Sequence, residues 1–144
     1  MQTKENAALV EALNEMLARE HSCAIRYATH AAVLTGPFGE SLSKQLKEIA
    51  SDEIKHAGKL RERVFALGGA PTMEVHSTSL RPSATLAQML DQNIHEEQGA
   101  VEEYTRILQM IPRLNVILYE TVEDILRDEQ EHLEKLLTLK PAEE

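Results

Sequence analysis

The sequence predicts an all-α protein, a four-helix bundle with two helical hairpins joined by a long connection. Apolar residues recur with a period near 3.6 residues over four long stretches, as on helices with one buried face. Tryptophan is absent, and only 6 glycines and 5 prolines interrupt the chain. At 144 residues the chain is long enough to bury its own core, so we expect one domain over residues 1–144.

Breaks in the periodicity separate the helices. Gly36 and Pro37 end the first helix, Gly68 and Gly69 close the second, and Pro112 separates the last two. The expected helices therefore cover about residues 4–34, 41–67, 84–110 and 113–139.

Residues 71–83 form the one long connection. It is polar, carries two prolines and shows no periodic pattern. A loop of this length inside a compact domain usually has a task, and we expect it to run the length of the bundle. Thr85 and Gln88 have the spacing of a capping box, which predicts the start of the third helix there.

Charge and cysteine content narrow the functional classes. A net charge of −9 disfavours binding to nucleic acid or to an anionic membrane. No 18-residue apolar stretch is present, and the N-terminus lacks the pattern of a signal peptide. A single cysteine, Cys23, cannot form an intrachain disulfide, so we expect a cytoplasmic protein in which Cys23 is a small core residue.

Two Glu-x-x-His motifs carry the functional signal. Glu53 with His56, and Glu129 with His132, each lie on the apolar side of an expected helix. At a spacing of three residues the carboxylate and the imidazole share a helix face, so they can bind one metal ion together. About one such pair is expected by chance in this composition. The repetition and the apolar setting of both pairs therefore carry the interpretation.

The other two helices each add a glutamate. Glu20 precedes Glu53 by 33 residues, and Glu96 precedes Glu129 by the same interval, which indicates two similar hairpins around one site. Four buried carboxylates repel one another and lose hydration, but two divalent cations balance their charge. Oxygen ligands with one imidazole per metal suit Fe(II), Mn(II) or Zn(II). We predict a dinuclear metal site in the bundle core.

The chain resembles ferritin-like di-iron proteins of the bacterioferritin branch over about residues 13–137. Four stretches carry the resemblance: residues 13–20, 52–57, 96–100 and 125–132. The resemblance implies a ferroxidase that binds two Fe ions per chain and oxidises Fe(II) to Fe(III) with O2 or H2O2, for iron storage or detoxification. It also implies a homo-oligomer, either a dimer or a shell. By position it implies that Glu20 and Glu96 are terminal ligands and that Glu53 and Glu129 bridge the two metals. It also implies that His56 and His132 each bind one metal, and that Tyr27 lies near the centre.

Three departures from the family pattern refine these expectations. Ile54 stands where bacterioferritins have a haem-binding methionine, so no haem is expected. The short fifth helix of the large ferritin shells is expected to be missing, since the sequence stops just past the fourth. Gly99 stands where rubrerythrins have an additional glutamate ligand.

Two other functions fit the same ligands. One is a rubrerythrin-type or catalase-type di-iron or dimanganese enzyme that consumes peroxide, and the other is a static metal-binding protein, for instance one that holds zinc. Outside the site, Glu103 is expected to pair with an arginine in preference to a transient iron site, and His21 and His95 are expected at the surface or an interface. Three further glutamates are expected on a solvated face: Glu97, Glu102 and Glu131.

Overall fold

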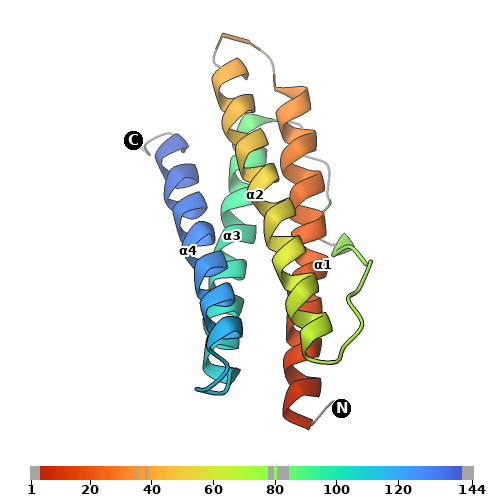
Figure 1. Ribbon diagram of the computed structural model, residues 1–144. Coiled ribbons are helices and arrows are strands. Elements are labelled where there is room, and N and C mark those ends of the chain that lie inside the picture. The colour runs from red at the N-terminus through yellow and green to blue at the C-terminus, as the bar shows by residue number, and fades with distance from the viewer. Residues whose placement is uncertain (1–3, 35, 38, 78–79, 81–84, 141–144) are drawn as a thin grey trace.

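The computed structural model describes residues 4–34, 36–37, 39–77, 80 and 85–140. Four α-helices follow one another in this part of the chain, and they form a bundle (Figure 1). The predicted all-α class is confirmed. The helices are α1 (Lys4–Val33), α2 (Gly39–Ala66), α3 (Leu86–Met110) and α4 (Val116–Leu139).

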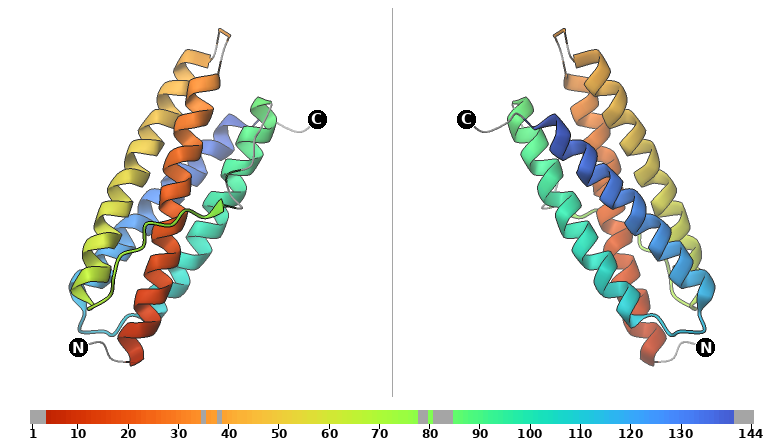
Figure 2. Two further views of the ribbon diagram at one scale, coloured as in Figure 1. Left: turned by 90° about the vertical axis from the view of Figure 1, so that its right-hand side faces the viewer. Right: turned by 90° about the vertical axis from the view of Figure 1, so that its left-hand side faces the viewer.

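The helices pack as two antiparallel hairpins. α1 lies against α2 and α3 lies against α4, and the two hairpins face each other across the core (Figure 1). α2 and α3 run in the same direction, because the chain returns to the far end of the bundle between them (Figures 1 and 2). The expected crossover is therefore present.

Helix ends follow the local chemistry. The predicted capping box is confirmed: the Thr85 side chain accepts from the Gln88 backbone N–H, and the Gln88 side chain accepts from the Thr85 N–H. α4 begins at Val116, three residues later than expected, because the Asn115 side chain accepts from the Leu118 N–H and caps the helix. α2 ends at Ala66, and Gly68 in the turn after it has a φ of 87°, which suits a residue without a Cβ.

The crossover follows α1 in the same direction (Figure 2). Asn14 donates to the carbonyl of Ala70 near the beginning, and further on the His76 N–H donates to the carbonyl of Ala18. The Ser22 hydroxyl donates to the His76 carbonyl at 3.1 Å. These bonds hold the described part of the connection against one face of α1.

The core consists of two apolar clusters stacked along the bundle. One contains Leu13 and Leu17 of α1, and the other contains Cys23 and Tyr27 of the same helix. Glu20 lies between them in sequence and is only 1 % exposed. The two clusters therefore enclose a buried polar layer at this level of the bundle.

Candidate metal centre

Four carboxylates and two imidazoles make up the buried polar layer. Each helix contributes, and no residue of the six is more than 5 % exposed. Burial of so many ionisable groups is costly unless they are paired or bind a cation. The six residues are Glu20 from α1, Glu53 and His56 from α2, Glu97 from α3, and Glu129 and His132 from α4.

The layer divides into two overlapping groups of four. The His56 group adds Glu20 to Glu53 and Glu129, and the His132 group adds Glu97 to the same two glutamates. Within each group, one possible ligand atom per residue lies within 4.8 Å of all the others. Two of the six residues, Glu53 and Glu129, thus belong to both groups.

Each histidine directs Nδ1 toward the carboxylates. In the His56 group, Nδ1 lies 3.0 Å from Glu129 Oε1, 3.4 Å from Glu53 Oε1 and 3.5 Å from Glu20 Oε2. In the His132 group, Nδ1 lies 3.3 Å from Glu53 Oε1 and 3.7 Å from an oxygen of Glu97 and of Glu129. The two rings are 6.2 Å apart between centroids.

Unpartnered polar atoms indicate that the six residues could hold metal ions. Among the described residues, the buried side-chain nitrogen and oxygen atoms without a hydrogen-bond partner include both imidazole Nδ1 atoms and both oxygens of the shared glutamates, Glu53 and Glu129. Glu20 and Glu97 each leave Oε2 unpartnered in the same way. Eight buried polar atoms without a hydrogen-bond partner in one layer are unusual for a native core. Carboxylate oxygens together with imidazole nitrogens are a ligand set that suits divalent transition metals.

An aspartate from the opposite hairpin holds the far side of each imidazole. His56 Nε2 lies 2.8 Å from Asp128 Oδ2, and His132 Nε2 lies 2.9 Å from Asp52 Oδ2. In the neutral imidazole, with Nε2–H donating to the aspartate, Nδ1 is the nitrogen left with a lone pair. Carboxylates behind a metal-binding histidine fix its tautomer in this way.

A tyrosine holds one oxygen of each unshared glutamate. Tyr27 of α1 donates to Glu97 Oε1 at 2.7 Å, and Tyr104 of α3 donates to Glu20 Oε1 at 2.7 Å. Burial raises the pKa of both phenols well above the ordinary value, and the nearby glutamates raise it further. Both hydroxyls therefore stay protonated and remain donors.

Without metal, protons carry the positive charge of the layer. Burial raises the pKa of Glu53 and Glu129, and the neighbouring glutamates raise it further. Burial opposes the charged imidazoles, but the contacts with carboxylates prevail: they raise the pKa of His56 far above its usual range and that of His132 to about 9. Divalent cations and these protons compete for the same atoms.

The third helix supplies Glu97 where the sequence had suggested Glu96. The expected solvated position of Glu97 is wrong, since this side chain is 1 % exposed and belongs to the His132 group. The buried stripe of α3 passes through Asn93, Glu97, Ala100 and Tyr104. Glu96 lies about 100° round the helix from Glu97, outside both groups, with one oxygen 3.9 Å from Arg19 Nε.

Equal spacing led to the wrong residue. The expected interval of 33 residues holds between Glu20 and Glu53, whereas Glu97 and Glu129 are 32 residues apart. Nothing requires the two hairpins to have equal intervals, because each turn sets its own. A better signal was available: Tyr27 lies seven residues after Glu20, and Tyr104 lies seven residues after Glu97.

Sequence reasoning also missed the residues that support the ligands. No role was predicted for Tyr104, Asp52 or Asp128. Both aspartates directly precede a Glu-x-x-His motif, so their repetition was visible in the sequence. Tyr27 was expected near the centre, and its contact with Glu97 places it there.

Other singled-out residues lie outside the layer. Glu103 pairs with Arg106 at 2.7 Å, as expected for the arginine alternative. His21 contacts the Glu74 carbonyl and Arg61 at the surface, and His95 is exposed. The predicted core position of Cys23 is confirmed at 2 % exposure. Two of the three glutamates expected on a solvated face are exposed: Glu102 and Glu131.

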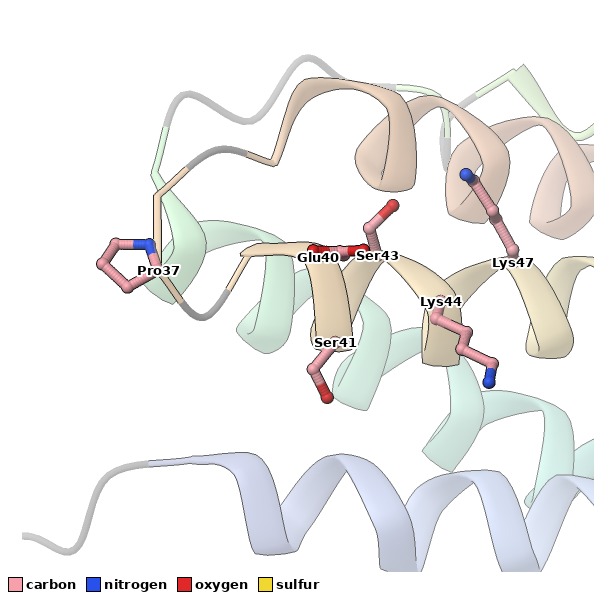
Figure 3. A pocket seen from close by; sticks show the side chains of 6 residues that line it. All are labelled: Pro37, Glu40, Ser41, Ser43, Lys44 and Lys47. Carbon is pink, nitrogen blue, oxygen red and sulfur yellow. The ribbon is translucent and has the colours of Figure 1, made fainter.

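A surface hollow at the start of α2 is separate from this centre (Figure 3). Ser41 and Lys44 point to one side of α2, and Ser43 and Lys47 point to the other (Figure 3). These polar groups do not converge on a point, so the hollow offers no ligand set. Among the described helices, none is long and apolar enough to cross a membrane.

Comparison with known proteins identifies related sequences and folds. The chain is 28 % identical over 129 residues to the bacterioferritin of Desulfovibrio desulfuricans, covering 88 % of this chain and 71 % of the relative. A solved ferritin-like diiron-carboxylate protein from Bacillus anthracis superimposes with a TM-score of 0.90 at 30 % identity, covering 96 % of this chain and 99 % of that one.

A second solved structure shows the same fold at lower identity. The dodecameric thioferritin of Bacteroides fragilis, described as bacterioferritin-related, has a TM-score of 0.84 at 23 % identity and covers 92 % of this chain and 84 % of its own. The family model for the ferritin-like domain matches residues 10–140, which include all six residues of the buried layer. The chain belongs to the ferritin family, with bacterioferritins among its homologues.

Proposed function

We propose that this protein is a ferroxidase that binds two Fe(II) ions per chain and oxidises them to Fe(III) with O2 or H2O2. One observation carries the proposal: the two overlapping groups of unpartnered carboxylate and imidazole atoms, sealed between apolar clusters. The bacterioferritin relatives and the diiron-carboxylate structure support it.

The proposal assigns the ligands by group. Glu53 and Glu129 belong to both groups, so each is assigned to bridge the two metals. Glu20 with His56 completes one metal site, and Glu97 with His132 completes the other. Glu96 is not retained as a ligand, because Glu97 occupies that place in the layer. Four carboxylates match the charge of two divalent cations when both imidazoles are neutral.

Two Fe(II) ions held together supply two electrons at one place, which suits the reduction of O2 or H2O2. The protein residues set the conditions for this chemistry. The carboxylates favour the higher charge of Fe(III), the aspartates keep each histidine in the Nδ1-binding tautomer, and the apolar clusters exclude bulk water. Protons that leave Glu53, Glu129 and the imidazole Nδ1 atoms on loading must pass to solvent.

The remaining expectations belong to the same proposal. We propose a cytoplasmic homo-oligomer without haem, and the exposed apolar side chains Ile25, Ile54 and Phe65 support association with further copies. Light scattering on the purified protein measures the number of subunits. Storage of Fe(III) as mineral requires a closed shell, whereas a dimer would restrict the function to detoxification.

The deciding experiment is an anaerobic Fe(II) titration of the metal-free protein, followed by addition of O2. We expect saturation at two Fe(II) per chain and rapid growth of the ultraviolet absorbance of Fe(III). Repetition with H2O2 identifies the preferred oxidant. Sustained turnover of H2O2 without accumulation of Fe(III) would replace this proposal with the peroxide-consuming alternative, and tight binding without any oxidation would indicate a static site.

A further inference from the structure

The two buried tyrosines beside the centre are arranged crosswise. Tyr104 on α3 donates to Glu20 on α1, and Tyr27 on α1 donates to Glu97 on α3, each at 2.7 Å. Both phenols are 0 % exposed. Each of these helices therefore supplies a glutamate to one group of the centre and a hydroxyl to the other group.

The glutamates they hold are the two that the groups do not share. Glu20 belongs only to the His56 group, and Glu97 belongs only to the His132 group. In each case the tyrosine occupies Oε1, and Oε2 has no hydrogen-bond partner among the described residues. A bond from a hydroxyl to a carboxylate is a strong one, so it fixes which oxygen remains free for a metal.

We propose that the two tyrosines are positioning residues, each of which sets the affinity of a different metal. Tyr104 acts through Glu20 on the metal of the His56 group, and Tyr27 acts through Glu97 on the metal of the His132 group. The inference rests on the proposed dinuclear site, and it gives a role to Tyr104, for which none was predicted.

Substitution by phenylalanine isolates the hydroxyl. Tyr104→Phe and Tyr27→Phe keep the aromatic ring in the core and remove only the donor. The freed glutamate oxygen then loses its partner, and the carboxylate can turn. Loss of such an outer hydrogen bond typically weakens metal binding about ten- to a hundredfold, and we expect the effect on one metal only.

The test uses Co(II), whose absorption spectrum reports its coordination. His132→Ala leaves the His56 group intact, and His56→Ala leaves the His132 group intact. In the His132→Ala background, Tyr104→Phe should weaken Co(II) binding about tenfold or more and change the spectrum, while Tyr27→Phe should change the affinity less than about twofold. In the His56→Ala background, Tyr27→Phe should weaken Co(II) binding and Tyr104→Phe should change it little.

A matched control is available, because the chain has three tyrosines. Tyr119 is 41 % exposed on α4, and Tyr119→Phe should leave Co(II) affinity unchanged in both backgrounds. Thermal unfolding of the metal-free variants separates a general loss of stability from a change at the centre. A purely structural role would lower the affinity of both groups in parallel and would overturn the proposal, as would no effect from either variant.

The intact site provides an independent check if a histidine variant does not fold. Each single tyrosine variant should lower one of two Co(II) binding constants, and the double variant should lower both additively. A single variant that lowers both constants equally would contradict the inference. Failure of Fe(II) oxidation in a wild-type protein that binds two metals would refute the ferroxidase and leave the tyrosine roles standing, whereas no metal binding at all would refute both.

Discussion

When α1 is aligned on α3 so that Glu20 falls on Glu97, Tyr27 falls on Tyr104, but the residues just before the two tyrosines differ. Arg26 corresponds to Glu103, and in the structure Arg26 is 2 % exposed whereas the side chain of Glu103 is 41 % exposed. The two hairpins thus agree wherever a residue touches the polar layer. They diverge where a side chain points away from it.

The two side chains also differ in their partners. Arg26 donates to Asn93 Oδ1 at 2.7 Å and to Cys23 Sγ at 3.3 Å, and the Asn93 amide lies 3.1 Å from His30 Nδ1. This polar network joins α1 to Asn93 of α3, whereas Glu103 pairs with Arg106 of its own helix. Internal symmetry in this chain is therefore a property of the ligand set and its supports, and it does not extend to the whole fold.

The largest expected effect comes from the residues shared by both groups. Glu53→Ala or Glu129→Ala should abolish binding of the metal pair, because each removes a ligand from both groups at once. The metal-free variants should resist heat better at neutral pH, since a buried carboxyl group is deleted. Metal content per chain and thermal unfolding measure the two results.

Glu131→Ala is the matched control for this change, because Glu131 is exposed on the same helix. It should keep two metals per chain. An unchanged metal content in both Glu53→Ala and Glu129→Ala would show that these glutamates do not hold the metals.

The next effect separates two adjacent glutamates on α3. Glu97→Gln should weaken binding of one metal by at least about a hundredfold, because a ligand charge is lost from the His132 group. Glu96→Gln should keep two metals with affinities within about twofold of wild type. Calorimetric titration of both variants compares them directly. If Glu96→Gln weakened metal binding more than Glu97→Gln did, Glu96 would be the ligand and the assignment of Glu97 would be overturned.

A smaller effect tests the supports across the hairpins. Asp128→Asn should weaken the metal held by His56 about tenfold, and Asp52→Asn should do the same for the metal held by His132. Both aspartate side chains are 41 % exposed, so we expect the low end of the usual range. The assignment requires that each substitution lowers only one of the two binding constants. Parallel loss of both would indicate a general electrostatic contribution.

The smallest effect concerns pH and the metal-free protein. The pKa of His132 is raised to about 9, so its contribution to stability is complete below about pH 6.5 and is lost as the pH rises through 9. Burial and Arg26 lower the pKa of His30 to about 4, so stability is lost in the other direction, as the pH falls from 6.5 through 4. Denaturant unfolding at pH 4, 6.5 and 9 in the presence of a chelator measures the loss of stability on the acid side (the acid limb) and on the alkaline side (the alkaline limb).

Matched substitutions assign each limb. His30→Gln should flatten only the acid limb, and His132→Gln should flatten part of the alkaline limb. The shared glutamates also lose protons on the alkaline side, so some slope should remain there. A pH-independent stability of the metal-free protein would contradict the charge distribution described for the layer.

Periodicity and turn residues were sufficient to predict the four helices, the crossover and the capping box at Thr85. These features depend on local patterns that a sequence displays directly. The five of the six expected ligands that the structure brings together lie on strong apolar stripes or in Glu-x-x-His motifs. Glu97 was missed because the stripe of α3 is polar at Asn93 and carries two adjacent glutamates, so that only packing against α1 decides which one turns inward.

The tyrosine and aspartate contacts could not be predicted for a different reason. Each joins residues from separate hairpins, such as Tyr104 with Glu20 or Asp128 with His56. Such pairs depend on the vertical register of one hairpin against the other, which no local pattern sets. Once the register is fixed by the structure, the repetition in the two halves explains why the same residue types recur.

Each hairpin carries three of the six residues in the polar layer. Metals bound there join the hairpins at mid-height, so the hairpins cannot part while the metals stay in place. Contacts completed only in the native state slow unfolding more than they speed folding. In the loaded protein, the opening of the bundle should therefore limit the release of buried metal to an excess of chelator. The rate of metal extraction would then measure the rate of that opening.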